Sequence, residues 1–419
     1  MGRGAVRSLR LVGLMLAAAA LLLVPSAAIA AKKHKKKPKK VNYSALYTTT
    51  NDPHGNRVIM FRRSANGTIT QKKSVKTGGT GIAAQQPFGF PIVDSSGSMA
   101  LTSDGKLLFV VNDGDNTISS FQITASGPKL INRVTSGGIL PVSLTIHKNL
   151  LYILNEVSGT IFGYRFTKTG FLTPIINSER ALSKVGPDGV SASIGFSPNG
   201  KVLVVSQRDL PARKGVIDTF TVRRDGSTNP AVPHTADDAN PFGFAWASGR
   251  LIISNVGFVA TPPNVMPNPA DPTQFNGSTS SYNVSNSGQL TLVNTASSNA
   301  RAACWVVVSK DQKFAFVVNT LSGKAVPQDI GTGHNSISRY SIAPNGALTL
   351  LGNTDTTPAG FPGDEGLSSD GKYLYVLTPF VMGQNTSHID VYSVSGGNLT
   401  HIQNTPRTLP NGVSGIAVH

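Results

Sequence analysis

Seven short apolar runs recur along the chain, and each ends in a polar residue. They are rich in β-branched and aromatic side chains and are bounded by turn-forming residues, which is the pattern of buried β-strands. The runs span residues 46–51, 107–112, 150–155, 202–207, 251–255, 314–319 and 373–378. A pattern of this kind predicts an all-β protein built from a repeated unit.

The residues around these runs repeat as well. Tight turns precede several of them, at 103–106, 197–201 and 369–372, and their Asp-Gly and Asn-Gly pairs favour two-residue hairpin turns. An aliphatic-x-x-aromatic piece and then a glycine turn follow each run. The aromatic members lie 43 to 62 residues apart, at Phe61, Phe121, Tyr164, Phe220, Tyr282, Tyr340 and Tyr392. Four strands per unit at this spacing predict the blades of a β-propeller.

The two ends of the repeat complement each other. The first unit lacks an inner strand before Tyr43, whereas the last unit is followed by a surplus apolar segment at 415–419. We therefore predict a seven-bladed β-propeller of four-stranded antiparallel blades over residues 42–419, closed by the C-terminal strand completing the first blade. Closure of this kind removes the exposed sheet edges that an open arrangement would leave. The alternative is a pair of smaller all-β domains.

The residues before the repeat have the features of an exported protein. Arg3, Arg7 and Arg10 precede an apolar stretch at 11–24, and Ala28-Ile29-Ala30 has the small-x-small form of a cleavage site. Residues 1–30 are therefore expected to be a signal peptide. We predict a secreted, periplasmic or envelope-associated protein, with no stable membrane span after cleavage because the stretch is shorter than about 20 residues.

A lysine-rich segment follows the expected cleavage site. Residues 31–41 contain seven lysines, and like charges at this density favour a disordered tether over a folded element. Contact with an anionic envelope polymer is the alternative role of this segment. The net charge is +17, of which the three leader arginines and the seven tail lysines carry ten, which leaves +7 for the folded part. This value and the absence of a recognition motif argue against a nucleic-acid partner.

The single cysteine, Cys304, excludes an internal disulfide framework. It precedes Trp305 in a strand-like run, so a buried inert thiol is favoured over a nucleophile. The spacing of histidines and carboxylates shows no metal-binding signature, and no glycine-rich phosphate loop occurs. We therefore expect neither a metal nor a cofactor, and we expect a monomer.

The candidate site residues lie where blades join on one face. In antiparallel blades, the connections between strands two and three and between successive blades share a face, and the long loops of blades four to seven are predicted to wall it. Arg301, Asp364 and Glu365 enter inner strands there, and His334 lies in the blade-six loop. Together these four residues could bind an anion or perform acid–base chemistry, with capping and structural pairing as the alternative.

The repeat resembles the lactonase-type seven-bladed propellers, which include phosphogluconolactonases and carboxymuconate-lactonising enzymes, and it is related to surface propellers with Tyr-Val-x-Asn repeats. The resemblance rests on Ser-Gly-Gly-x-Leu-Pro-Val-Ser at 136–143, Ser-Pro-Asn-Gly-Lys at 197–201, Tyr-Ile-Leu-Asn at 152–155 and Asn-Gly-x-Leu-Thr at 345–349. It implies a channel-mouth site in which Arg301 and Glu365 would supply the cation and the acid. The stretch comparable to the histidine-bearing element of the lactonising branch, 189–193, has no histidine.

Two functions follow from this comparison. The first is that of an exported lactonase-like enzyme acting on a lactone or a related cyclic carboxylate. The alternative is a non-catalytic extracellular propeller that binds a protein or a glycan, because one fold hosts many functions.

Overall fold

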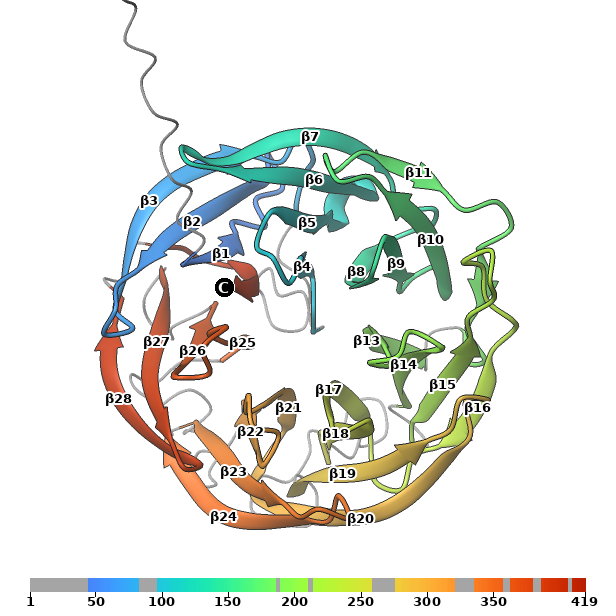
Figure 1. The fold of residues 1–419 in the computed structure, drawn as a ribbon, viewed down its shortest axis with the longest axis vertical. Helices are drawn as coiled ribbons and strands as arrows, with labels where there is room; N and C mark the ends of the chain where they lie inside the picture. The colour runs from blue at the N-terminus through green and yellow to red at the C-terminus, as the bar shows by residue number, and fades with distance from the viewer. Residues whose placement is uncertain are drawn as a thin grey trace, which may run out of the picture. The chain divides into compact units, whose positions relative to one another are not determined.

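Residues 44–82, 96–185, 189–209, 214–257, 276–320, 335–356, 362–379, 386–405 and 409–419 are described by a computed structural model. The chain divides into two units, Met1–Lys39 and Lys40–His419, and every described residue lies in the second. Within that unit, seven antiparallel sheets are arranged in a ring (Figure 1). The prediction of an all-β, seven-bladed propeller is therefore confirmed. No helix among the described residues has the length and apolar character needed to cross a bilayer.

The strands of the first four blades follow one another from the inner edge of each sheet outward. Blade one contains β30 (Ser414–Val418), β1 (Ala45–Thr49), β2 (Arg57–Arg63) and β3 (Ile69–Lys76). Blade two contains β4 (Met99–Leu101), β5 (Leu107–Asn112), β6 (Thr117–Thr124) and β7 (Gly127–Thr135), with a 3-10 turn, η1 (Asp113–Asp115), after β5. Blade three contains β8 (Pro141–His147), β9 (Leu150–Asn155), β10 (Thr160–Phe166) and β11 (Leu172–Pro174), and β12 (Arg180–Ala181) also pairs with β10. Blade four contains β13 (Gly189–Phe196), β14 (Val202–Asp209), β15 (Val216–Thr221) and β16 (Val232–Thr235).

The last three blades follow the same order. Blade five contains β17 (Pro241–Ala247), β18 (Arg250–Asn255), β19 (Asn276–Val284) and β20 (Leu290–Arg301). Blade six contains β21 (Ala303–Val308), β22 (Phe314–Asn319), β23 (Ser336–Ile342) and β24 (Leu348–Asp355). Blade seven contains β25 (Asp364–Leu367), β26 (Tyr373–Thr378), β27 (Thr386–Ser395) and β28 (Asn398–Asn404), and β29 (Leu409–Pro410) pairs with the start of β27.

The second strand of each blade is buried on both sides, which explains why its sequence is continuously apolar rather than alternating. All six residues of β5 are buried, for example, and so are all eight of β14. Neighbouring blades pack through hydrophobic clusters, such as the one that joins Tyr152 of blade three to Phe196 and Phe220 of blade four. The stability of each blade therefore depends on the blades on either side of it.

The polar residue that ends each apolar run has a structural role. Asn255 Nδ2 donates hydrogen bonds to Ser278 Oγ at 2.9 Å and to Ser280 Oγ at 2.8 Å, both on the neighbouring strand. Asn319 Nδ2 makes the same pair of contacts with hydroxyl groups on β23. A buried amide that is hydrogen-bonded in this way avoids the desolvation penalty of an unpaired polar group. These amides end the apolar strands without disturbing the packing between blades.

The turns between the first and second strands differ from the two-residue type that the sequence predicted. Of the Asp104-Gly105 pair, only Gly105 has a positive φ, +70°. Gly105 N donates to Thr102 O, and Thr102 N donates to Leu107 O, so the turn is longer than two residues. The Asp104 carboxylate accepts the Lys106 N–H at 3.1 Å, which holds Asp104 at a negative φ. The prediction of a two-residue hairpin turn was therefore wrong.

The ring closes as predicted, through the pairing of β30 with β1. Leu46 lies opposite Val418, and Thr49 lies opposite Ser414. Thr49 Oγ1 donates to Ser414 O at 2.8 Å. A hydrophobic cluster containing Leu46 and Ile416 then packs blade one against blade seven.

Deletion of residues 414–419 should remove most of the stability of the propeller. It leaves β1 with an unpaired edge and opens the interface between blades one and seven, because each fully buried aliphatic side chain contributes about 2 kcal/mol. Circular dichroism is expected to show a broad transition at a markedly lower temperature than in the full chain. An unchanged, cooperative transition would contradict the structural role of the closure.

Candidate active site at the loop-bearing face

Two faces of the ring differ in the connections that they carry. The turn face carries the connections between strands one and two and between strands three and four. The loop face carries the connections between strands two and three and between successive blades. The long loops predicted to wall the loop face lie largely in 210–213, 258–275, 321–334 and 380–385, outside the described residues. The wall therefore stays a prediction.

Asp364 begins β25, the inner strand of blade seven, at the loop face. Its side chain is 5% exposed, and Oδ2 accepts the backbone N–H of Ile416 at 3.1 Å. Oδ1 accepts the N–H of Glu365 at 2.9 Å. Burial raises the pKa of Asp364 to about 7, although these two N–H groups act to lower it. Asp364 is therefore held in place by backbone donors of β25 and β30.

Glu365 lies on the opposite side of the same strand, because successive side chains of a strand alternate. Glu365 is 6% exposed, and its carboxyl group faces the backbone N–H of Val307, in β21 of blade six. That N–H acts to lower the pKa of Glu365, yet neither carboxyl oxygen makes a hydrogen bond of ordinary geometry. Burial, together with the Asp364 charge, raises the pKa of Glu365 well above its usual value. The ionised form of a carboxyl group in this state is a stronger base than an exposed carboxylate.

Arg301 ends β20, opposite Asn276, and is partly exposed. Ala302 follows with φ +50° and turns the chain into β21. Val307, whose N–H faces the Glu365 carboxyl group, comes six residues after Arg301. Extended residues advance about 3.3 Å each, so roughly 20 Å of chain separates the Arg301 backbone from that contact. The structure thus brings Asp364 and Glu365 together and places Arg301 at the end of the outer strand of blade five, two residues before blade six begins, while His334 lies outside the described residues.

The segment that leads into blade two lies against the inner strands of two other blades. Ser96 N donates to Ala192 O of β13 at 3.0 Å. Ser143 Oγ of β8 donates to Ser96 O at 2.6 Å, and Leu144 N donates to Gly97 O at 2.9 Å. The channel beside blades three and four is therefore occupied by chain, which limits where a ligand can lie.

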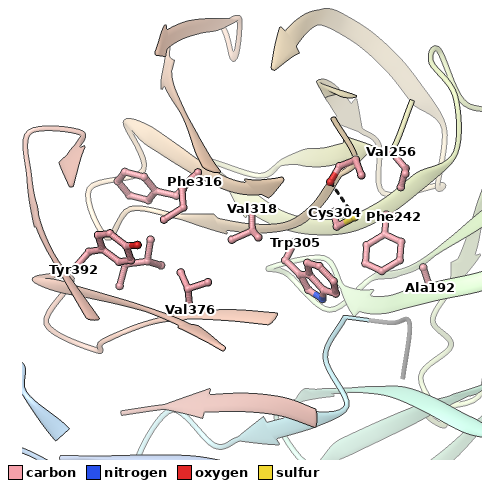
Figure 2. Packing of buried hydrophobic residues seen from close by; sticks show 12 residues of the cluster. Ala192, Phe242, Val256, Cys304, Trp305, Phe316, Val318, Val376 and Tyr392 are labelled. Atoms are coloured by element: carbon pink, nitrogen blue, oxygen red, sulfur yellow. Dashed lines mark hydrogen bonds between the residues drawn. The ribbon is translucent and has the colours of Figure 1, made fainter. Parts of the chain in front are cut away.

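Cys304 belongs to the apolar wall between the inner strands (Figure 2). It is 6% exposed, and Sγ donates to Ala302 O at 3.2 Å. Trp305 packs edge-on against Phe242, with ring centroids 5.2 Å apart. The Arg208 guanidinium lies 5.1 Å from the centroid of the same Phe242 ring. The thiol is buried, as expected, and the wall carries the cation Arg208, which lies near the end of the second strand of blade four.

Asp113 is a buried acid that the sequence analysis missed. It begins η1 at the loop face of blade two, is 4% exposed, and its Oδ2 has no hydrogen-bond partner. Burial raises the pKa of Asp113 to about 8, and the charges of Asp115 and Glu156 add to this effect. The only sign of this buried acid in the sequence is that Asp113 and Asp115 flank Gly114.

Blade seven contains a second group that the sequence analysis missed. Asp390 is fully buried; Oδ2 lies 3.2 Å from His388 Nε2, and Oδ1 lies 3.4 Å from His401 Nε2. Serine occupies the corresponding register position in blades two, five and six. Blade four has Asp218 at the same position, so an alignment of the repeats column by column would have separated these two aspartates from the three serines. Among the described residues, no group of three or more His, Cys, Asp or Glu side chains is arranged to hold a metal ion.

Comparisons with known proteins agree with the resemblance seen in the repeat. Residues 44–178 match the family model "Lactonase, 7-bladed beta-propeller". The periplasmic gluconolactonase of Pseudomonas aeruginosa shares the fold with a TM-score of 0.61 and 17% identity, over 90% of this chain and 100% of that one. A provisionally named 6-phosphogluconolactonase of Bacteroides fragilis gives a TM-score of 0.62 and 18% identity, over 91% of this chain and 99% of that one.

A similarly named protein of Bacteroides uniformis gives a TM-score of 0.60 and 19% identity, over 88% of this chain and 98% of that one. No curated protein matches the sequence. The predicted resemblance to lactonase-type propellers is therefore confirmed. At these identities the solved structures establish the fold alone.

Asp364→Asn should flatten the dependence of stability on pH. The folded-state pKa of Asp364, about 7, lies above the unfolded value of about 3.9, so the folded chain holds more protons between these values and stability falls as the pH rises through this window. The variant removes this loss, which for a difference of about three pKa units is about 4 kcal/mol at pH 7.5, measured by urea denaturation from pH 4 to pH 8.

Asp104→Asn serves as the control, because the Lys106 side chain that donates to Asp104 lowers its pKa to about 2. It should leave the fall in stability between pH 4 and pH 7 unchanged. If Asp364→Asn kept the slope of the wild type, the assignment of a raised pKa to Asp364 would be wrong.

Proposed function

We propose that the protein hydrolyses a lactone at the loop face and that Glu365 transfers the protons of the reaction. The observation that carries the proposal is the Glu365 carboxyl, which is buried, raised in pKa and without an ordinary hydrogen bond, on an inner strand. The match of residues 44–178 to the lactonase family model supports the substrate class.

Lactone hydrolysis needs a group that both takes and gives a proton. In the first step, the ionised Glu365 accepts a proton from a water molecule while the water oxygen bonds to the lactone carbonyl carbon. In the second step, the bond between this carbon and the ring oxygen breaks, and Glu365 returns the proton to that oxygen. The product is an open-chain hydroxy acid, and atoms and charge balance without any other reactant. The raised pKa of Glu365 makes its ionised form a stronger base for the first transfer.

Asp364 acts in this scheme as a positioning residue. Its two backbone hydrogen bonds fix the start of β25, and its charge raises the pKa of Glu365. Arg301, which ends the outer strand of blade five just before blade six, would hold the polar end of the substrate or the developing negative charge on the carbonyl oxygen.

We also propose that the protein acts outside the cytoplasm. The basic and apolar pattern of residues 1–30 and the small-x-small site at 28–30 support export. The gluconolactonase of Pseudomonas aeruginosa that shares the fold is periplasmic. The absence of disulfides is compatible with this location, because the core between the blades stabilises the ring without them.

Glu365→Gln should abolish hydrolysis while leaving the fold intact. A pH-stat can follow acid release from a panel of five- and six-membered lactones, including sugar lactones, after subtraction of the spontaneous rate. The variant is expected to lose about 100-fold or more in kcat, because it cannot exchange a proton. Arg301→Ala should mainly raise KM.

Asp218→Asn is the matched control. Asp218 is also a buried carboxyl whose pKa is raised by burial, but Ser183 and Gln207 donate hydrogen bonds to it. This variant should keep the activity of the wild type. Full activity in folded Glu365→Gln would refute the assignment of Glu365, and no turnover by the folded wild type across the panel would refute the lactonase proposal.

A further inference from the structure

A concave pocket with a volume of about 370 Å³ opens on the turn face, away from the candidate active site. Its lining comes from the turns of blades three, four and five. The cations in the lining are Lys148, Lys201, Arg223 and Arg224. Among the described residues, no acidic side chain lines it. We call this group of four cations and the space between them the basic pocket.

The four cations are exposed, and none of their side chains makes an ion pair or a hydrogen bond among the described residues. Four other cations of the described part of the propeller, Arg63, Lys106, Arg133 and Lys184, have close carboxylate partners. Lys106 Nζ lies 2.9 Å from Asp104, and Arg133 Nη2 lies 2.6 Å from Asp115. Like charges that have no carboxylate at ion-pair distance among the described residues repel one another, which leaves the basic pocket electrostatically suited to an anion.

The turn between the first two strands of blade four lacks a negative charge that the same turn has in three other blades. In blades two, six and seven, an aspartate closes this turn by accepting the N–H of the lysine two residues later, at 3.1 to 3.2 Å; these are Asp104, Asp311 and Asp370. In blade four, Asn199 Oδ1 accepts the Lys201 N–H at 3.0 Å in the same way. The geometry is preserved, but the negative charge beside Lys201 is absent.

The turn between the last two strands of blade four adds two more charges. Arg223 N donates to Ser227 O at 2.8 Å, and Gly226 N donates to Arg223 O at 3.0 Å. The same two backbone hydrogen bonds form in blades one, three, five and six, where Ser64, Thr167, Ser285 and Ala343 occupy the position of Arg223. The turn itself therefore does not require an arginine. Asp225, beside the arginines, is fully exposed, accepts hydrogen bonds from Ser227 and does not line the pocket.

Neutral donors line the pocket as well. The buried His147 Nε2 has no hydrogen-bond partner, and Asn199 Nδ2 donates to Asn286 Oδ1 at 2.8 Å. Burial, and to a smaller extent the Lys148 charge, lowers the pKa of His147, so its imidazole favours the neutral form with one N–H to donate. Gly200 lies so close to the imidazole that an added Cβ would be 2.3 Å from Nε2. Asn199 and Asn286 therefore add neutral polar groups to the lining of the pocket.

We propose that the basic pocket binds a small ligand that carries two phosphate charges or more, such as a diphosphate. Arginine and lysine side chains recognise phosphate oxygens through charge-assisted hydrogen bonds. The volume lies near the lower end of the range of small-molecule sites, about 300–1,000 Å³, so a compact ligand fits better than an extended one. This site lies on the turn face and does not depend on the proposed lactonase activity.

Isothermal titration calorimetry with inorganic pyrophosphate tests the proposal on the full chain. The wild type should bind one pyrophosphate, with an affinity that falls as the salt concentration rises. Arg223→Ala/Arg224→Ala should weaken this binding about tenfold or more. Lys313→Ala/Lys372→Ala, which removes two cations from the equivalent turns of blades six and seven on the same face, should change it less than about twofold.

Asn199→Asp is the sharpest variant, because it installs the aspartate that three other blades already carry in this turn. The fold should be unaffected, and the added charge beside Lys201 should weaken pyrophosphate binding about threefold or more. The rate of lactone hydrolysis should be unchanged by this substitution.

Three results would overturn the proposal. The first is no heat of binding up to about 10 mM pyrophosphate at low salt, which lies beyond the range of specific small-ligand affinities. The second is an equal loss of affinity in the Lys313→Ala/Lys372→Ala control, which would indicate a general surface field. The third is binding of a poly(glycerol phosphate) polymer without any binding of pyrophosphate, which would indicate an extended surface contact instead of a pocket.

Discussion

The pairing of β30 with β1 joins the two ends of the repeat and makes the ring continuous. Every blade has apolar side chains on both of its faces, so no blade can be stable unless a neighbour covers each face. Pairing of β1 with β30 supplies the last of these contacts. It also places the backbone N–H of Ile416 beside Asp364, so the contact that closes the fold holds one member of the candidate site.

The same ring explains why the candidate acids have unusual properties. Inner strands of neighbouring blades lie side by side, and a carboxylate on such a strand faces another blade rather than water. Glu365 faces blade six and Asp364 faces blade one, so burial favours the neutral form of both. Many buried polar groups elsewhere in the ring are amides and hydroxyls that bond to one another, as Asn255 Nδ2 does. Glu365 differs in that neither of its carboxyl oxygens has a hydrogen-bond partner of ordinary geometry, and the proposed chemistry uses these two oxygens.

Departures from the repeat mark the places where function is best sought. Most positions of a blade have the same role in every copy, so a residue that the common geometry does not require is a candidate for another role. Asn199 stands where three other blades have an aspartate, and Arg223 stands where four have a smaller residue. Asp390 stands, as Asp218 does in blade four, where three blades have a serine. The first two lie in the basic pocket. The third forms a buried group with His388 and His401, for which the structure supplies no ligand.

The fold was largely predictable from the sequence because its cause is local and repeated. The apolar runs at 107–112, 150–155, 314–319 and 373–378 coincide with β5, β9, β22 and β26, since buried strands leave a continuous apolar signature. The turn type was not predictable, because the Asp104 side chain, rather than the Asp-Gly pair alone, decides the backbone geometry. For the site, the sequence placed Asp364 and Glu365 correctly at the start of an inner strand.

The sequence could not show which neighbours those two acids meet. The surroundings of Asp364 and Glu365 come from β30 and β21, which are distant along the chain. Asp113 and the contacts of Asp390 were missed for the same reason, since their burial depends on packing between elements. The loop wall and His334 belong to residues outside the described part of the chain, and their roles stay predictions.

The proposed function depends on a Glu365 carboxyl whose pKa is held well above its usual value by its place in the ring. The chain contains only three glutamates, Glu156, Glu179 and Glu365, so a carboxyl-labelled sample gives a spectrum simple enough to assign. A carbon NMR titration from pH 3 to pH 9, with Glu365→Gln to identify the resonance, measures this pKa directly. We predict that the resonance that is lost in Glu365→Gln titrates with a midpoint well above 4.5. A midpoint for that resonance at or below 4.5 would contradict it.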